Sequence, residues 1–342
     1  MLKPIVSIIL PVYNGSAFLS EAVSSILEQN ISEIELIAIN DASTDESDKI
    51  LRRFSDKRIL HISNSTNIGL ASTLNLGIEE AKGKFIARMD QDDIADPIRL
   101  SLQVKEFINN KNLGICGSNF YTFGAKNEYV SDYPLNHEKI FTNLLFYNCI
   151  AHPTTMFRKS TFVENSLNYN HKFDWAEDFE LWTRARYLTK IINLKRPLLK
   201  YRINSNSMTA SNESRVHKSV NDINKRSLLE IGINASDEIL NLHLKIGHHI
   251  IDLKDTEQVE KTMNHLWNII INNQTYKVYN EIELKNVIGI FWNPILQKIS
   301  NDFRSNFLDT DLSKYLNSKV NVQLGLAKTN FKKTLKKLIL RK

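Results

Sequence analysis

The segment FIARMDQDDIADP, residues 85–97, joins a short apolar run to four carboxylates. Its first part, Phe85–Met89, has the composition of a buried strand. The acids that follow are Asp90, Asp92, Asp93 and Asp96. Carboxylates this close together repel one another unless a cation lies between them. We therefore expect a buried strand that ends at a cation-binding site.

Strands and helices alternate along the first 120 residues. Apolar runs predict strands at residues 5–10, 35–39, 59–62 and 85–89. Helices are predicted at residues 17–28 and 71–81, after Pro97, and from Ser43 toward Phe54, where STDE (Ser43–Glu46) is a capping box. This alternation indicates βαβ units. The predicted fold class is α/β, with a mainly parallel sheet flanked by helices.

Polar residues follow each predicted strand. They are Tyr13 and Asn14, beside the apolar Pro11, after the first strand, Asp41 after the second, Asn67 after the third, and Arg88 and Asp90 at the fourth. In open parallel sheets, ligands bind beyond the carboxyl ends of the strands. We expect these side chains to converge on one rim and to form a binding site.

Asp90 and Asp92 form a D-x-D motif, in which the two side chains share a face of an extended segment. Oxygen ligands suit Mg²⁺ or Mn²⁺, which proteins commonly hold with one or two carboxylates plus substrate phosphates. A calcium loop of the EF-hand type is excluded, because its required Gly and Glu are Ala95 and Ser101 here. The alternative is a solvated acidic turn that caps the next helix.

Several ligand classes are disfavoured by the sequence. Neither GxGxxG nor GxxxxGK[ST] occurs, which argues against a dinucleotide enzyme and a P-loop NTPase. The net charge of +6 comes from six basic residues within 331–342, and the remaining 38 basic residues balance the 38 acidic ones. Aromatic residues do not alternate with the basic ones in this tail. Both features argue against a nucleic-acid partner.

The tail, FKKTLKKLILRK (331–342), has apolar residues at helical spacing. A basic amphipathic helix can lie on an anionic membrane surface, which is therefore an expected partner. A solvated terminal helix packed on its own domain is the alternative. No apolar run is long enough to cross a bilayer as a helix, and the first apolar run is interpreted as a strand rather than a signal peptide. Cys116 and Cys149 have no metal or redox spacing, so a cytoplasmic protein with reduced thiols is expected.

Four segments together resemble glycosyltransferase family 2. They are VSIILPVYNG, LIAINDASTDES, NIGLASTLNLGIEEAKGKFIARMDQDD and DWAEDFELWTRA, in this order within residues 3–205. The resemblance implies a GT-A fold and an inverting, metal-dependent enzyme that uses a nucleotide sugar. Within the family, ARMDQDDIADP, DWAEDFELW and LLKYRINSNSMT are most similar to bacterial lipooligosaccharide β-1,3-N-acetylglucosaminyltransferases. This implies transfer from UDP-N-acetylglucosamine to a terminal β-galactose of a surface glycan.

The resemblance also implies roles for the donor side. Tyr13 would lie near the uracil, and Asp41 would accept hydrogen bonds from the uracil or the ribose. Asp90 would lie near the ribose and the diphosphate, and Asp92 would bind the metal directly, with Asp90 beside it. Arg88 would orient this cluster. Pro11, Asn14 and Asn67 complete the expected donor site.

Asp178 would be the catalytic base. Inversion needs a single in-line attack, and a carboxylate must take the proton of the acceptor hydroxyl. Trp175, Glu177 and His152 would border the acceptor, with Trp175 offering a flat face to a sugar ring. The alternative for Glu177 and Asp178 is that they complement a helix dipole. A core tryptophan and a structural histidine are the alternatives for Trp175 and His152.

Two positions depart from the family pattern: Asn40 replaces one of a usual acidic pair, and Asn204 stands where relatives often carry His. Two other functions stay open, because donor choice turns on a few pocket contacts and because the two departures would fit a loss of catalysis. The fold could use UDP-galactose or UDP-N-acetylgalactosamine, or the protein could bind a nucleotide sugar without catalysis.

The expected organisation is a catalytic domain at residues 1–210 and a helical region at 211–342 that ends in the basic tail. From about Ser214 onward, apolar residues recur at helical spacing without a catalytic motif. We expect this region to shape the acceptor site, support oligomerisation or carry the tail. The expected location is peripheral, on the inner face of the bacterial cytoplasmic membrane.

Overall fold

A computed structural model describes residues 3–124, 126, 128–173, 175–203, 213–299, 307–308 and 310–317 of the chain. The chain forms two compact units. The first unit contains Met1–His137 and Cys149–Asn212, and the second contains Glu138–Asn148 and Glu213–Lys342. The domain boundary predicted between residues 210 and 211 stays a prediction. Asn204 and residues 331–342 lie outside the described residues.

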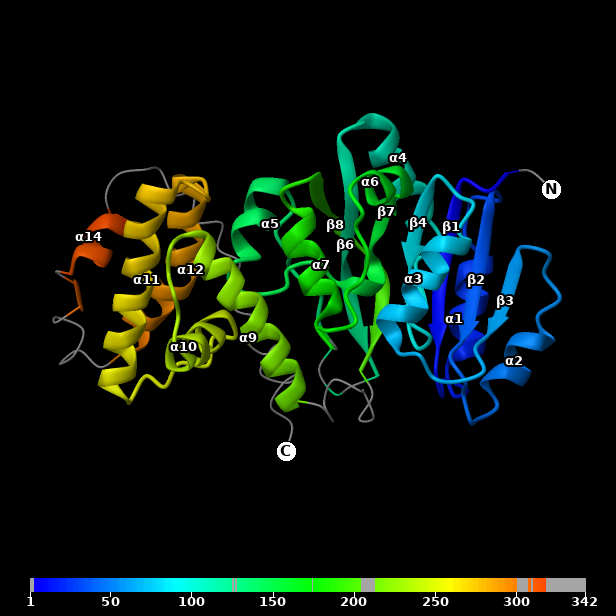
Figure 1. Ribbon diagram of the computed structural model, residues 1–342, viewed down its shortest axis with the longest axis horizontal. Helices are drawn as coiled ribbons and strands as arrows, with labels where there is room; N and C mark the ends of the chain where they lie inside the picture. The colour runs from blue at the N-terminus through cyan, green and yellow to red at the C-terminus, as the bar shows by residue number, and fades with distance from the viewer. Residues whose placement is uncertain are drawn as a thin grey trace. The chain divides into compact units, whose positions relative to one another are not determined.

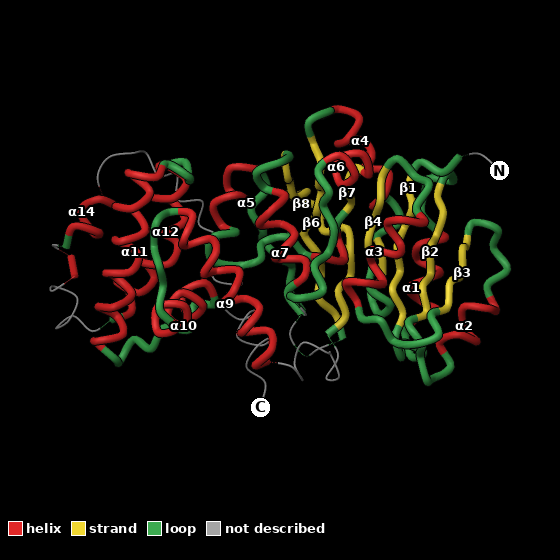
Figure 2. Tube along the Cα trace, viewed as in Figure 1, coloured by secondary structure: helices red, strands yellow, loops and turns green. Residues whose placement is uncertain are grey.

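The first unit is built on an eight-stranded sheet in the order β3-β2-β1-β4-β7-β6-β8-β5 (Figures 1 and 2). The strands are β1 (Val6–Val12), β2 (Ile34–Asn40), β3 (Ile59–Ser63), β4 (Phe85–Arg88), β5 (Ile94–Ala95), β6 (Leu113–Phe123), β7 (Met156–Arg158) and β8 (Lys190–Arg202). The first four strands pair in parallel, while β7 is antiparallel to both β4 and β6. The four strands predicted from the sequence are present.

Helices cover both faces of this sheet. They are α1 (Leu19–Leu27), α2 (Ser47–Arg53), α3 (Leu70–Glu80), α4 (Arg99–Asn109), α6 (Lys159–Glu164) and α7 (Glu177–Ala185), with a 3-10 turn, η1, at His152–Thr154. Alternate residues of β1, such as Ile8 and Leu10, pack in one core with α1 and α4. Ile9 lies on the opposite face, where a Cβ on Gly77 of α3 would be 2.5 Å from its side chain. The sheet is therefore the middle of three layers.

One predicted helix start is wrong. The helix expected from Ser43 begins at Ser47, and the expected capping box does not form. The hydroxyl of Ser43 instead accepts a hydrogen bond from the backbone N–H of Asn14 at 3.0 Å. A carboxylate oxygen of Asp45 accepts from the N–H of Ser47 at 3.0 Å. A long-range partner has replaced the local cap.

The second unit is helical. It contains α9 (Glu213–Glu230), α10 (Asp237–Gly247), α11 (Thr256–Tyr276), α12 (Glu281–Lys298) and α14 (Asp311–Asn317), together with most of α5 (His137–Asn143). Its apolar core includes Leu228, Leu266 and Trp292. None of the described helices combines the length and apolarity needed to cross a membrane.

Candidate active site

The carboxyl ends of β1, β2 and β4 meet at one edge of the sheet, as the parallel pairing requires. The segment after β1 is fixed through its backbone. Four consecutive backbone N–H groups donate to side chains at 2.9–3.0 Å. Tyr13 donates to Gln91 and Asn14 donates to Ser43. Gly15 donates to Ser47 and Ser16 donates to Asp45. Asn14 is in the left-handed region, with φ of 51°. Pro11 is buried within β1, and Tyr13 is 37% exposed.

Asp41 joins the end of β2 to the segment before α3. One carboxylate oxygen accepts from Asn64 at 2.8 Å and from the N–H of Ile68 at 2.9 Å. The other accepts from the N–H of Gly69 at 3.0 Å. The side chain of Asn67 donates to the backbone carbonyl of Asp41 at 3.3 Å. Since a carboxylate has about four acceptor positions, Asp41 keeps capacity for one further donor.

Asn40 has a structural explanation. Its amide nitrogen donates to the carboxylate of Asp48 at 3.1 Å, and its amide oxygen accepts from the N–H of Ser43 at 3.1 Å. An ionised acid at this position could accept from Ser43 but could not donate to Asp48. The departure at Asn40 therefore suits the hydrogen bonds that this side chain makes.

The acid cluster, Asp90, Asp92 and Asp93, lies directly after β4. Asp90 pairs with the buried guanidinium of Arg88 at 2.5 Å. Burial, and then the charge of Asp90, raise the pKa of Asp92 to about 6. Asp93 is 1% exposed, and burial with the neighbouring acids raises its pKa well above the usual range.

The acid cluster fits a hard divalent cation. Among the described residues, the buried Oδ2 atom of Asp93 has no hydrogen-bond partner. The cluster offers only oxygen ligands, and its raised pKa values show that protein groups leave the acids' charges incompletely balanced. Both features suit Mn²⁺ or Mg²⁺.

Arg202, at the end of β8, forms hydrogen bonds with two residues of the acid cluster. Its side-chain Nε donates to the backbone carbonyl of Asp92 at 2.8 Å, and its backbone N–H donates to a carboxylate oxygen of Asp93 at 2.9 Å. The guanidinium lies between the rings of Phe18 and Phe123, 4.1 and 4.3 Å from their centroids. We did not predict this contact, because it joins residues about 110 positions apart.

Glu177 and Asp178, the acid pair, are the first two residues of α7. Glu177 is 6% exposed, and burial followed by repulsion from Asp178 raises its pKa to about 8. His152 Nδ1 is 3.7 Å from Glu177, and His152 Nε2 is 2.9 Å from the hydroxyl of Tyr169. Burial, and then Arg88, lower the pKa of His152 well below its usual value. His152 is therefore neutral at physiological pH.

Arg88 connects the two acidic groups. It interacts electrostatically with Asp90 and Glu177, and the pull of Asp90 raises the pKa of Arg88 although burial opposes it. His152, Glu177 and Asp178 each offer a ligand atom within 4.8 Å of the others, which a metal ion could use. Glu177 is mainly protonated near neutral pH because its pKa is about 8, whereas the acid cluster keeps an unpartnered carboxylate oxygen on Asp93, so the acid cluster is the better candidate for the cation.

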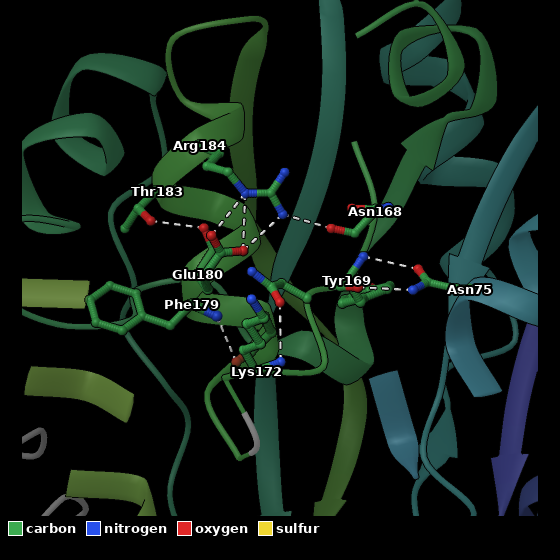
Figure 3. Close-up of polar contacts among 10 residues, drawn as sticks. Asn75, Asn168, Tyr169, Lys172, Phe179, Glu180, Thr183 and Arg184 are labelled. Carbon is green, nitrogen blue, oxygen red and sulfur yellow. Dashed lines mark hydrogen bonds and ion pairs between the residues drawn. The ribbon is translucent and has the colours of Figure 1, made fainter. Parts of the chain in front are cut away.

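The segment before α7 is clamped at two points (Figure 3). The amide of Asn75 on α3 pairs with both backbone groups of Tyr169, at 2.8 and 2.9 Å. Arg184 is held by the buried Glu180 at 2.8–3.0 Å and donates to the carbonyl of Asn168 at 2.6 Å. These contacts fix the segment that leads to the acid pair.

Trp175 lies in this clamped segment with φ of 68°. The left-handed region is strained for a bulky residue, and such strain concentrates at binding and catalytic sites. The side chain is half-buried, so it is not a fully buried core tryptophan. Tyr169, Arg202 and Gln91 are the site residues that sequence reasoning missed.

The chain is similar in sequence to known glycosyltransferases. Residues 7–165 match Glycosyl transferase family 2. An uncharacterized glycosyltransferase of Haemophilus influenzae is 36% identical over 225 residues, covering 60% of this chain and 68% of the relative. The O-antigen biosynthesis glycosyltransferase WbnJ of Escherichia coli is 34% identical over 215 residues, covering 60% and 82%. The chain belongs to glycosyl transferase family 2.

Solved structures share the fold. S. aureus TarS 1–349, solved with UDP-GlcNAc, has a TM-score of 0.56 at 16% identity and covers 91% of each chain. The mannosyltransferase PcManGT from Pyrobaculum calidifontis, solved with GDP-Man and Mn²⁺, has a TM-score of 0.53 at 15% identity and covers 92% of this chain and 86% of its own. The predicted GT-A fold with a C-terminal helical region is confirmed.

Proposed function

We propose that the protein is an inverting glycosyltransferase that moves N-acetylglucosamine from UDP-N-acetylglucosamine to a terminal β-galactose of a bacterial lipooligosaccharide or polysaccharide, forming a β-1,3 linkage. The observation that carries this proposal is the buried Arg88, which interacts with the acid cluster through Asp90 and with the acid pair through Glu177. A leaving-group site and a base site are thereby held within one active site.

The donor is proposed to lie along the sheet edge. Tyr13, with its partly exposed ring, would contact the uracil, and Asp41 would use its remaining acceptor capacity on the uracil or ribose. Pro11, Asn14 and Asn67 shape the same edge. The same-fold neighbour solved with UDP-GlcNAc and the relative named for O-antigen biosynthesis support a UDP-sugar donor and a bacterial glycan acceptor.

Asp92, with Asp90 beside it, would hold Mn²⁺ or Mg²⁺. When bound, such an ion stabilises the negative charge that develops on the diphosphate leaving group. Arg88 orients Asp90 through their ion pair at 2.5 Å. Arg202 fixes the backbone of Asp92, so the oxygen ligands are placed in advance.

Asp178 is proposed to take the proton from the acceptor hydroxyl. It lies at the amino end of α7, next to Glu177, which is mainly protonated at neutral pH because its pKa is about 8. Trp175, Glu177 and His152 would border the acceptor. Residues 1–210 would form the catalytic domain and 211–342 the helical region. The basic tail would bring the enzyme to the inner face of the cytoplasmic membrane.

A donor screen tests this proposal. The purified protein is incubated with Mn²⁺, lactose as a β-galactoside, and each common UDP-sugar, with a chelator control. We expect product from UDP-N-acetylglucosamine alone, and none with chelator. Product from UDP-galactose or UDP-N-acetylgalactosamine would support the alternative donors. Donor binding without transfer or hydrolysis would support a binding protein without catalysis.

Asp178→Asn separates catalysis from binding. A positioned general base contributes about 10²–10⁴-fold to rate, so we expect a loss of that size with UDP affinity unchanged. Asp92→Asn is the complementary variant and should weaken Mn²⁺-dependent UDP binding. Equal transfer by Asp178→Asn and the wild type would exclude Asp178 as the base.

A further inference from the structure

Gln91, the middle residue of the D-x-D motif, contacts the segment after β1. Its amide oxygen accepts from the N–H of Tyr13 at 2.9 Å, and its amide nitrogen donates to the carbonyl of Tyr13 at 3.0 Å. One side-chain amide thus satisfies both backbone groups of a residue 78 positions away. The acid cluster and Tyr13 are joined directly by this pair of bonds.

The position of Gln91 is supported by Gly15. A Cβ on Gly15 would lie 2.1 Å from the amide oxygen of Gln91, so a bare Cα is required where the amide packs. The next three backbone N–H groups, from Asn14 to Ser16, are bound by the 43–47 segment. Gln91 is therefore a direct contact through which the acid cluster can influence Tyr13.

We infer that Gln91 is a positioning residue that couples cation binding at Asp90 and Asp92 to nucleoside binding at Tyr13. The inference rests on the proposed function, which places the cation and the uracil at these residues. A cation that orders the Asp90–Asp92 backbone also orders Gln91, and hence the backbone of Tyr13. Coupling between two sites is reciprocal, so the nucleoside would strengthen cation binding by the same factor.

This coupling differs from a direct bond between metal and phosphate. Uridine has no phosphate, so Mn²⁺ can change its affinity only through the protein. UDP responds to Mn²⁺ through both routes. Comparing the two ligands therefore separates the protein-mediated route from the direct one, and the Gln91 variants show how much of the protein-mediated route depends on Gln91.

The experiment measures uridine and UDP affinities with and without saturating Mn²⁺, using calorimetry with UDP displacement for the weaker ligand. In the wild type we expect Mn²⁺ to tighten uridine binding about fivefold, at the low end of typical couplings. Gln91→Met keeps the side-chain length without the polar amide. In this variant the ratio of uridine affinities with and without Mn²⁺ should fall to about one, while UDP binding should still depend on Mn²⁺.

Two matched variants sharpen the result. Gln91→Glu keeps an acceptor for the N–H of Tyr13 but places a carboxylate oxygen against its carbonyl. Gly15→Ala displaces the Gln91 amide from the opposite side, at a position without positive φ. Both should lose the uridine response. Hydrogen exchange of the Tyr13 segment gives a second readout, and Mn²⁺ should slow it only in the wild type.

The outcomes distinguish this inference from the proposed function. If wild-type uridine binding ignores Mn²⁺ while UDP binding responds to it, the coupling is wrong and the proposed function stands. Retention of the full uridine response by Gln91→Met would also overturn the coupling. If neither UDP nor Mn²⁺ binds, the proposed function itself fails. Melting temperatures of all variants report whether each one is folded.

Discussion

Glu177 and Asp178 are adjacent acids at the start of one helix, but their exposures differ. Glu177 is buried beside His152, while Asp178 is half-buried. Burial and the charge of Asp178 raise the pKa of Glu177 to about 8, so most Glu177 is protonated at pH 7. The acid pair then carries less charge than two free carboxylates, which lowers the cost of packing it beside neutral His152.

The raised pKa predicts the stability of Glu177→Gln. Because the folded-state pKa of Glu177 lies above its unfolded value of 4.5, the folded state binds more protons between about pH 4.5 and 8. Wild-type stability therefore falls as pH rises through this window and levels off above it. Each pKa unit corresponds to about 1.4 kcal/mol, so over the 2.5 units between pH 4.5 and pH 7 glutamine should become relatively more stable by about 3–4 kcal/mol.

Melting curves at pH 5 and pH 8 test this prediction. The difference in melting temperature between Glu177→Gln and the wild type should increase at the higher pH. Glu79→Gln, at an exposed position of α3, controls for the loss of one carboxyl group. A difference that is the same at both pH values would contradict the assignment of a raised pKa.

At the scale of elements, the segment between α6 and α7 depends on contacts from other elements. Asn75 reaches it from α3 and pairs with the backbone of Tyr169, whose hydroxyl contacts His152. A net hydrogen bond contributes about 1 kcal/mol. Asn75→Leu loses both hydrogen bonds to the Tyr169 backbone, so the segment should be destabilised by about 2 kcal/mol.

We expect Asn75→Leu to raise the KM for the acceptor about tenfold and to leave UDP affinity unchanged. Asn75→Asp keeps the acceptor for the N–H of Tyr169 but loses the donor, so its effect should be intermediate. Steady-state kinetics with varied lactose, beside UDP titrations, provide the measurement. A loss of UDP affinity equal to the loss for the acceptor would mean that Asn75 supports the whole domain rather than the acceptor side.

The elements that sequence predicted best are those with local signals. Strands β1 to β4 and helices α1 and α3 are present because buried apolar runs and helical periodicity are properties of adjacent residues. The contacts of Gln91, Asn75 and Arg202 were missed, because each joins a side chain to backbone 78 to 110 positions away. The wrong start of α2 has the same origin, since Ser43 binds Asn14 rather than its own helix.

At the scale of the whole molecule, the second unit includes a segment from the middle of the chain. Residues 138–148 belong to it, and the carbonyl of Leu145 accepts a hydrogen bond from His243 Nε2 of α10 at 2.8 Å. The ring of His243 stacks on Phe146 with centroids 5.0 Å apart. A Cβ on Gly247 would be 2.2 Å from the carbonyl oxygen of Phe146, so glycine permits this approach.

Two buried histidines make this unit sensitive to acid. Because His243 Nε2 donates to a carbonyl, neutral His243 accepts at Nδ1 from His265 Nε2, 2.9 Å away. Burial is the main cause that lowers the pKa values of His243 and His265 to about 4 and about 3. The folded state therefore binds fewer protons than the unfolded state below about pH 6.5, and stability falls as pH decreases from there toward pH 4.

Hydrogen exchange in α10 and α11 should therefore accelerate between pH 7 and pH 5, after correction for intrinsic rates. At pH 5 each histidine corresponds to about 2 kcal/mol of lost stability, from about 1.4 kcal/mol per pH unit below 6.5. His265→Gln keeps a donor near the position of Nε2 but does not titrate, so it should lose about a third of the wild-type sensitivity, because burial also lowers the pKa of His248 in this unit to about 4. Exposed His171 in the first unit gives the control variant His171→Gln, which should leave the exchange of α10 and α11 unchanged. Equal acid sensitivity in the wild type and His265→Gln would show that this buried pair does not limit the stability of the helical unit.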